Sequence, residues 1–143
     1  MKLHITPYLF FDGRCAEAIS FYQNAIGAEV VFMMQYKDAP EGLPSEMGKP
    51  ELRERVMHAT FKIGDSEIMT ADAPPGNHKG HGGFSLSITV ATEAQAKQIF
   101  TAMSDDGKVL MPLSPTFFSS CFGTLEDKFG VEWMVYVEGQ TQS

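Results

Sequence analysis

The sequence predicts an α+β fold built from two βαβββ modules. Two stretches rich in β-branched and aromatic residues are each followed by a segment with helical spacing of apolar residues, and further β-prone segments follow each helix. A connection rich in glycine and proline, residues 73–83, separates the two halves. The chain has 143 residues, of which 43% are hydrophobic, so it can bury a sizeable core. We therefore expect one domain over residues 1–143, with modules at about 1–72 and 84–138.

The first module begins with a strand and an amphipathic helix. Residues 3–11 read LHITPYLFF, a β-prone stretch, and Asp12-Gly13 ends it. Apolar residues then recur with helical spacing between 15 and 26, and Gly27 follows them, as is typical of a helix C-terminus. Three further strands are expected, at about 28–36, 55–63 and 66–72.

Residues 37–54 separate the second and third of these strands. They include Pro40, Pro44 and Pro50 and show no hydrophobic period. A connection of this length in a small domain is usually functional or disordered. We expect a long, mobile surface loop.

The second module repeats the order of elements. Residues 84–90, FSLSITV, predict a strand, and Thr92 with Gln95 three positions later predicts a capping box at a helix start. Short strands are expected near 108–112, 116–123 and 132–138. A short internal echo also indicates a duplication, because KIG and EIM at 62–69 are matched by KFG and EWM at 128–134.

Composition argues against several partners. The net charge is −7 and the eleven basic residues are scattered, whereas a phosphate-binding surface needs clustered Lys and Arg. We therefore expect neither nucleic acid nor an anionic membrane surface as a partner. No apolar run approaches the ~20 residues of a membrane span, and no signal peptide is evident. Cys15 and Cys121 are far apart, so we expect free thiols in a cytoplasmic protein.

Segments spread over nearly the whole chain carry a resemblance to a known family. They are TPYLFFDG at 6–13, AISFY at 18–22 with IGAE at 26–29, MHA at 57–59 with IMTAD at 68–72, and FG, DKFG and WM between 122 and 134. In order and spacing they resemble the PhnB-like branch of the vicinal oxygen chelate superfamily, which includes glyoxalases, bleomycin-resistance proteins and extradiol dioxygenases. The resemblance implies that each module curls into an incomplete barrel and that paired modules enclose a cavity. Many members hold a divalent metal there, and others bind a ligand without metal.

The resemblance also implies where such a metal would be held. The four ligand positions fall near Pro7, Met69, Phe84 and Met134. A hard or borderline divalent ion needs imidazole nitrogen or carboxylate oxygen, which none of these side chains offers. We therefore expect no metal and no other cofactor, with a shifted site that uses His58 and Asp72 as the alternative.

His58 and Asp72 are the polar candidates on predicted strands. Alternation places Val56, His58 and Thr60 on one face of their strand. His58 is either a cavity-facing imidazole, acting as a general base or ligand anchor, or a hydrogen-bonded histidine on an outer face or at a dimer contact. Asp72 is either a carboxylate at the cavity mouth or the residue that starts a turn before Ala-Pro-Pro.

The main functional hypothesis is a PhnB-like protein that binds a small organic ligand in an apolar cavity. The candidate ligand-binding residues are His58, Tyr8, Met69, Phe84, Phe118, Trp133 and Asp72. No catalytic residue is assigned. The alternatives are a metal-dependent glyoxalase- or dioxygenase-type enzyme and a structural dimeric module whose cavity its own side chains fill. We expect a homodimer, because open sheet edges are an aggregation risk and superfamily members commonly pair modules between chains.

Methyl transfer, a label that the PhnB-like family has at times carried, is not indicated by the residues. A nucleotide-type cofactor site needs a glycine-rich turn between a strand and a helix. The turn after the first strand, residues 12–15, has a single glycine.

Overall fold

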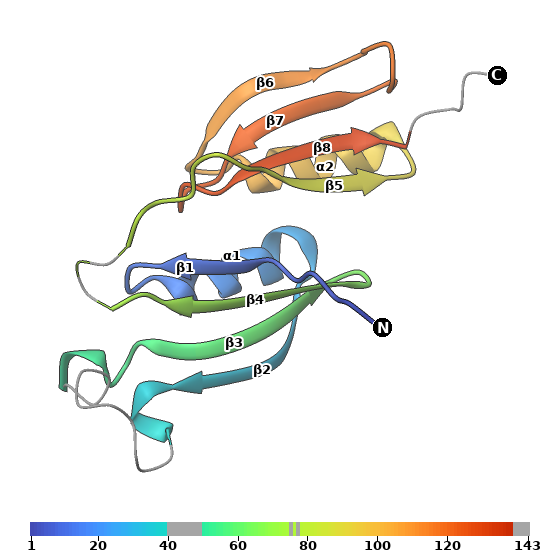
Figure 1. The fold of residues 1–143 in the computed structure, drawn as a ribbon. Helices are drawn as coiled ribbons and strands as arrows, with labels where there is room; N and C mark the ends of the chain where they lie inside the picture. Colours follow the sequence, from blue (N-terminus) through green and yellow to red (C-terminus); the bar gives the residue numbers. More distant parts are fainter. Residues whose placement is uncertain (40–49, 75, 77, 139–143) are drawn as a thin grey trace. The chain divides into compact units, whose positions relative to one another are not determined.

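The computed structural model describes residues 1–39, 50–74, 76 and 78–138. The chain divides into two compact units, Met1–Gly80 and His81–Ser143. Each contains one helix and one mixed four-stranded sheet (Figure 1). The predicted α+β class with two βαβββ modules is confirmed. Whether the two modules share one core stays a prediction.

The N-terminal module has the strand order β1-β4-β3-β2. Strand β1 runs parallel to β4, and the other neighbours are antiparallel. Its elements are β1 (Tyr8–Phe11), α1 (Cys15–Ile26), β2 (Glu29–Gln35), β3 (Val56–Ile63) and β4 (Ser66–Asp72).

Helix α1 covers one face of this sheet because its apolar residues share one side. Cys15, Ala18, Ile19 and Tyr22 are all buried, as the helical spacing predicts. The ring of Tyr22 stacks on Phe61 of β3, with ring centroids 5.7 Å apart. Alternation then places Ala59 on this helix-covered face as well.

The C-terminal module repeats this topology with the order β5-β8-β7-β6. Its elements are β5 (Leu86–Val90), α2 (Glu93–Met103), β6 (Lys108–Ser114), β7 (Phe122–Glu126) and β8 (Glu132–Val137). The predicted capping box is confirmed: the Gln95 backbone N–H donates to the Thr92 hydroxyl, and the Thr92 backbone N–H donates to the Gln95 side chain.

The two sheets match each other residue by residue. In the N-terminal sheet a row of cross-strand partners runs Tyr8, Met69, Thr60, Phe32. In the C-terminal sheet the corresponding row runs Ser87, Met134, Thr124, Met111. Both rows have a methionine and a threonine at the centre, so the duplication that the sequence echo indicated extends to the strand register.

Some predicted boundaries were wrong. Strand β1 begins at Tyr8 rather than at residue 3, and the last hairpin begins at Phe122 rather than at residue 116. Residues 116–119 form a turn instead, because the Thr116 hydroxyl accepts from the backbone N–H groups of Phe118 and Ser119. Such local side-chain bonds compete with strand pairing.

The predicted loop at 37–54 is structured at both ends. Short 3-10 helices span Tyr36–Asp38 and Pro50–Leu52, and Leu52 is buried. The backbone N–H of Lys37 donates to the Arg53 carbonyl, so the residues that follow β2 are bonded to the residues that precede β3. Residues 40–49, where most of the predicted mobile loop falls, lie outside the described residues.

Candidate ligand-binding site

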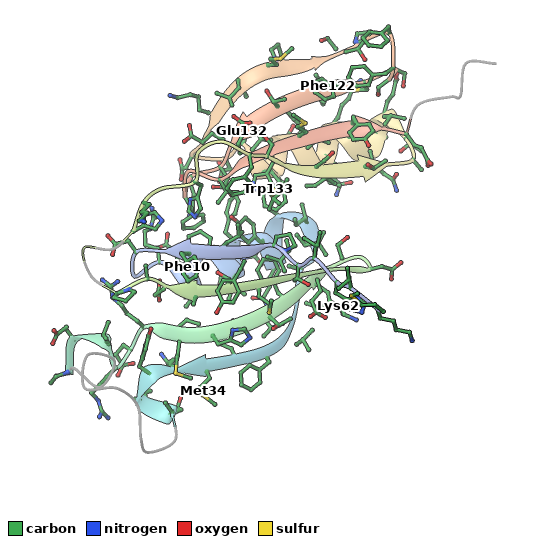
Figure 2. The ribbon with its side chains drawn as sticks, viewed as in Figure 1. Phe10, Met34, Lys62, Phe122, Glu132 and Trp133 are labelled. Atoms are coloured by element: carbon green, nitrogen blue, oxygen red, sulfur yellow. The ribbon has the colours of Figure 1, made fainter. Side chains whose placement is uncertain are left out.

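The face of the N-terminal sheet opposite α1, which we call the open face, gathers aromatic and thioether side chains. The residues on it include Tyr8, Phe10, Phe32, Met34, His58, Thr60 and Met69, which come from all four strands. Phe10 on β1 and Met34 on β2 mark the two edge strands of the sheet in Figure 2. The exposed fractions of Tyr8, Phe10 and Phe32 are 38%, 48% and 45%, large for such side chains.

Three polar groups form a continuous chain in the middle of this face. The Tyr8 hydroxyl oxygen lies 2.9 Å from His58 Nδ1, and His58 Nε2 lies 3.3 Å from Thr60 Oγ1. We call these side chains the Tyr8–His58–Thr60 chain. The predicted alternation of β3 is confirmed for His58 and Thr60, since Ala59 and Phe61 lie on the helix-covered face.

The Tyr8 phenol keeps its proton at neutral pH. Burial raises the pKa of Tyr8 above its ordinary value, and the nearby Cys15 and Tyr36 raise it further. The phenol is therefore a hydrogen-bonding group in this chain and not a phenolate, so the open face carries no negative charge at this point.

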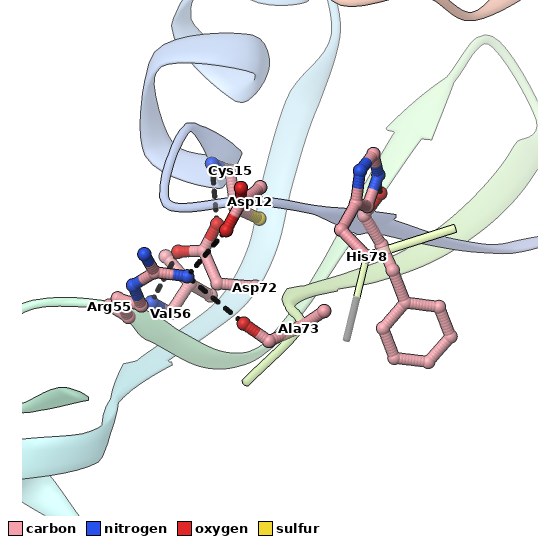
Figure 3. A network of polar contacts seen from close by, with 8 residues as sticks. Asp12, Cys15, Arg55, Val56, Asp72, Ala73 and His78 are labelled. Atoms are coloured by element: carbon pink, nitrogen blue, oxygen red, sulfur yellow. Dashed lines mark hydrogen bonds and ion pairs between the residues drawn. The ribbon is translucent and has the colours of Figure 1, made fainter. Parts of the chain in front are cut away.

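Asp72 is buried and bonded to the backbone of two other segments of its module. It is 2% exposed, and its two carboxylate oxygens accept from the backbone N–H groups of Cys15, at 3.0 Å, and Val56, at 2.9 Å (Figure 3). It therefore joins the N-terminus of α1 to the start of β3.

Arg55 reinforces the same corner of the module. Its guanidinium donates to Asp12 at 3.1 Å and to the Ala73 carbonyl at 3.0 Å (Figure 3). A Cβ atom at Gly13 would lie 3.2 Å from the Arg55 guanidinium, and Gly13 has φ +82°. The single glycine of the β1–α1 turn is thus explained by this packing, without a phosphate to bind.

The side chains at the expected ligand positions do not fit a divalent metal. The register pairs Met69 with Tyr8, not Pro7, and Met134 with Ser87, not Phe84, so two of the four sequence-assigned positions shift. The corrected partners still offer no imidazole or carboxylate.

The alternative site of His58 and Asp72 does not form either. His58 lies on the open face, whereas Asp72 is bonded to the first residue of α1 on the opposite face. The described parts of the chain contain no cluster of three or more His, Cys, Asp or Glu side chains that could hold an ion.

The C-terminal candidates do not gather at one place. Phe84 precedes β5 and is exposed, and Phe118 lies in the turn before β7 with its ring against Phe122. Trp133 lies on the helix side of β8: it is 2% exposed, and its indole N–H donates to Asp127 at 2.8 Å. The alternation of β8 turns its neighbours Glu132 and Met134 to the face of the C-terminal sheet opposite α2, so Trp133 is a core residue (Figure 2 labels Glu132 and Trp133).

The sequence missed four residues of the open face as site candidates: Phe10, Thr60, Phe32 and Met34. Phe10 follows Tyr8 by two positions and Thr60 follows His58 by two, so strand alternation could have found both. Phe32 could not be found in this way, because β2 contains a register shift between Val30 and Phe32.

Neither helix of the described part has the length and apolar content needed to cross a bilayer.

Comparisons with known proteins identify relatives over nearly the full length. Residues 3–136 match the sequence model of a family described as 3-demethylubiquinone-9 3-methyltransferase. Protein YjdN of Escherichia coli K12 is 34% identical over 143 residues, covering 95% of this chain and 96% of that protein.

Solved structures agree with this assignment. Protein PA1353 from Pseudomonas aeruginosa is 36% identical with a TM-score of 0.84, covering 97% of this chain and all of that one. A PhnB protein from Bacillus cereus, named as a putative 3-demethylubiquinone-9 3-methyltransferase, is 32% identical with a TM-score of 0.76, covering 94% of this chain and 99% of that one. The fosfomycin resistance protein FosX from Mesorhizobium loti, 10% identical over 99% of this chain and 95% of that one, shares the fold with a TM-score of 0.64. The chain therefore belongs to the PhnB-like family, described as 3-demethylubiquinone-9 3-methyltransferase, within the vicinal oxygen chelate superfamily.

Proposed function

We propose that this protein binds a small organic ligand on the open face of its N-terminal sheet, without the divalent metal that many superfamily members hold. The observation that carries the proposal is the Tyr8–His58–Thr60 chain set among exposed apolar side chains. Small-molecule sites typically combine apolar walls with a few polar groups that fix the orientation of the ligand. This face has both components.

The donor chemistry supports binding rather than metal-dependent catalysis. Methionine and tyrosine occupy the β4 and β1 positions at Met69 and Tyr8, and methionine and serine occupy the equivalent positions at Met134 and Ser87. Thioethers suit soft ions, whereas the glyoxalase and dioxygenase chemistries need ions that prefer nitrogen and oxygen. Thioethers also adapt well to apolar ligands. Methyl transfer is not part of the proposal, because the turn between β1 and α1 lacks the glycine-rich pattern of a nucleotide site.

The experiment compares two isosteric variants at matched positions. Thr60 and Thr124 are equivalent in register and equally buried, at 8% exposure, but only Thr60 has a histidine bonded to it. Native mass spectrometry of the gently purified protein is expected to show a co-purified organic molecule, without a metal. The Thr60→Val variant should lose most of the bound fraction, and the Thr124→Val variant should keep it.

The proposal has two ways to fail. Wild-type protein that carries nothing, and whose melting temperature responds to no compound of a chemically diverse metabolite set, would favour the structural dimeric module. A bound molecule that both threonine variants retain equally would place the ligand away from the Tyr8–His58–Thr60 chain.

A further inference from the structure

The rings on the N-terminal open face form an unbroken row across three strands. From β1 through β3 to β2 the order is Phe10, Tyr8, His58 and Phe32. Successive ring centroids are 4.8, 5.7 and 6.0 Å apart, all within the range of ring–ring contact. Neighbouring ring planes are inclined by 24°, 45° and 42°, so a flat ligand can lie against one ring and contact the edge of the next.

The hydrogen bonds within this row can run in either direction. A neutral imidazole has one donor and one acceptor nitrogen. Either the Tyr8 hydroxyl donates to His58 and His58 donates to Thr60, or the Thr60 hydroxyl donates to His58 and His58 donates to Tyr8. In both arrangements one end of the chain can still donate a hydrogen and the other end can accept one. A ligand hydroxyl, which is both donor and acceptor, satisfies either arrangement.

The C-terminal module shows that the chain is not required by the fold. At the equivalent register positions Ser87 replaces Tyr8, and Phe122 replaces His58 beside Thr124. The same topology is thus built there without a tyrosine–histidine pair. If this face only packed against apolar protein, the free donor and acceptor at the ends of the Tyr8–His58–Thr60 chain would lack hydrogen-bond partners, at a cost in free energy.

The charges around the row favour a neutral ligand. No charged side chain belongs to it, and the charged residues of the same face lie at its far end, where Lys62 is the cross-strand partner of both Glu29 and Glu67. These observations deepen the proposed function and rest on it. We infer that the open face takes a neutral, planar aromatic molecule bearing a hydroxyl group, with the ring stacked on the aromatic row and the hydroxyl bonded at Tyr8 or Thr60.

Matched probes test the two halves of this inference. 2-Naphthol carries the plane and the hydroxyl, 2-methylnaphthalene replaces the hydroxyl with a methyl group of similar size, and decahydro-2-naphthol keeps the hydroxyl but loses the plane. Protein labelled with carbon-13 in its methionine methyl groups reports where each probe binds. Met34 and Met69 lie on the N-terminal open face, whereas Met111 and Met134 lie on strands of the other module.

We expect 2-naphthol to shift the methyl signals of Met34 and Met69 and to bind about tenfold tighter than 2-methylnaphthalene, the usual worth of one hydrogen bond. Decahydro-2-naphthol has no aromatic ring, so it should cause no ring-current shifts of the methionine methyl signals. It should also bind more weakly than 2-naphthol. The Tyr8→Phe variant removes the hydroxyl, so it should abolish most of the tenfold preference for 2-naphthol. Because it keeps the ring, 2-methylnaphthalene should bind as before. The control variant Tyr136→Phe, on the C-terminal sheet, should change neither affinity.

The outcomes separate this inference from the proposed function. If 2-naphthol and 2-methylnaphthalene bind equally well near Met34 and Met69, or if decahydro-2-naphthol binds as well as 2-naphthol, the ligand class is wrong and the binding face stands. If Tyr8→Phe and Thr60→Val each leave the preference intact, the hydroxyl is bound elsewhere and the orientation is wrong. If every probe shifts only Met111 and Met134, or none shifts any methionine, the site itself is overturned.

Discussion

The carboxylate of Asp72 accepts a hydrogen bond from the backbone N–H of Cys15 at 3.0 Å, although 57 residues separate them in the sequence. The second oxygen of the same carboxylate accepts from Val56, so one buried side chain connects α1, β3 and the end of β4. A negative charge at the N-terminus of a helix is also favoured by the helix dipole.

The first prediction concerns this connection. Replacing Asp72 with Asn removes the charge and presents an amide NH₂ to one of two backbone N–H groups, which then lacks an acceptor. We expect Asp72→Asn to lower the free energy of unfolding by about 2 kcal/mol in urea denaturation. Asp12→Asn is the matched control. The Asp12 side chain is 56% exposed, so its ion pair with Arg55 should be worth less than about 1 kcal/mol. Equal losses in the two variants would contradict the role assigned to Asp72.

A second prediction concerns alkaline pH. Burial raises the pKa of the Cys15 thiol from 9.0 to about 12, with the Asp72 charge contributing and the Thr70 hydrogen bond opposing. Between these two pH values the unfolded chain releases a proton that the folded chain retains, so stability should fall as pH rises from about 9 towards 12. The raised pKa of Tyr8 and Tyr36 acts in the same direction above their ordinary value of 10.0.

Urea midpoints measured from about pH 7 to about pH 11 would check this. The Cys15→Ala variant should lose stability less steeply above about pH 9 than the wild type, even if it starts from a lower value. Parallel curves for the two proteins would show that the thiol does not contribute.

A third prediction concerns His58. Its ring bonds two side chains and no backbone group, and it is only half-buried. His58→Gln should therefore lower the melting temperature by no more than about 3 °C, which corresponds to about 1 kcal/mol in a domain of this size. The affinity for 2-naphthol should fall about tenfold, because the hydrogen-bonding chain is broken. A variant that melts much earlier but binds normally would assign His58 to the fold.

A fourth prediction concerns metal content. The register partners Tyr8 and Met69, and Ser87 and Met134, lack the nitrogen and carboxylate donors that zinc, nickel, iron and manganese use in proteins. Elemental measurement on gently purified protein should find well under one such ion per chain. About one ion per chain, retained after dialysis, would contradict it.

A fifth prediction is a homodimer. The edge strands β2 and β6 expose apolar side chains, among them Val31 at 57% and Leu110 at 42%. Exposed apolar edges favour association with another sheet edge or face. Light scattering should report about twice 15.8 kDa at micromolar concentration. The variants Val31→Lys and Leu110→Lys, tested separately, should show which edge is involved, and a monomer in the wild type would rule the dimer out.

Several features could be predicted because they depend on residues close in the sequence. The helical spacing from Cys15 to Tyr22 predicts the buried side of α1, and Thr92 with Gln95 predicts the start of α2. Strand alternation likewise placed His58 opposite Ala59. In each case the decisive contacts lie within one or two turns of helix or within one strand, so local geometry determines them.

Other features failed because local preference and tertiary contact disagree. Phe117 and Phe118 are β-prone, but the Thr116 hydroxyl takes the backbone N–H groups that strand pairing would need. Trp133 looked like a residue of an apolar ligand site, yet its indole bonds the buried Asp127 on the helix side of β8. A large aromatic residue on a strand has the same local signature in a core as in a binding site.

The sequence alone therefore determined the α+β class and the two βαβββ modules, because hydrophobic period and capping residues are properties of short segments. Only the tertiary structure decided that Tyr8, His58 and Thr60 form one hydrogen-bonded chain and that Asp72 lies on the other face of the sheet. These relationships depend on strand register and on contacts between residues 50 or more positions apart. Register is fixed by the packing of whole strands against one another and against α1, and no local pattern encodes it.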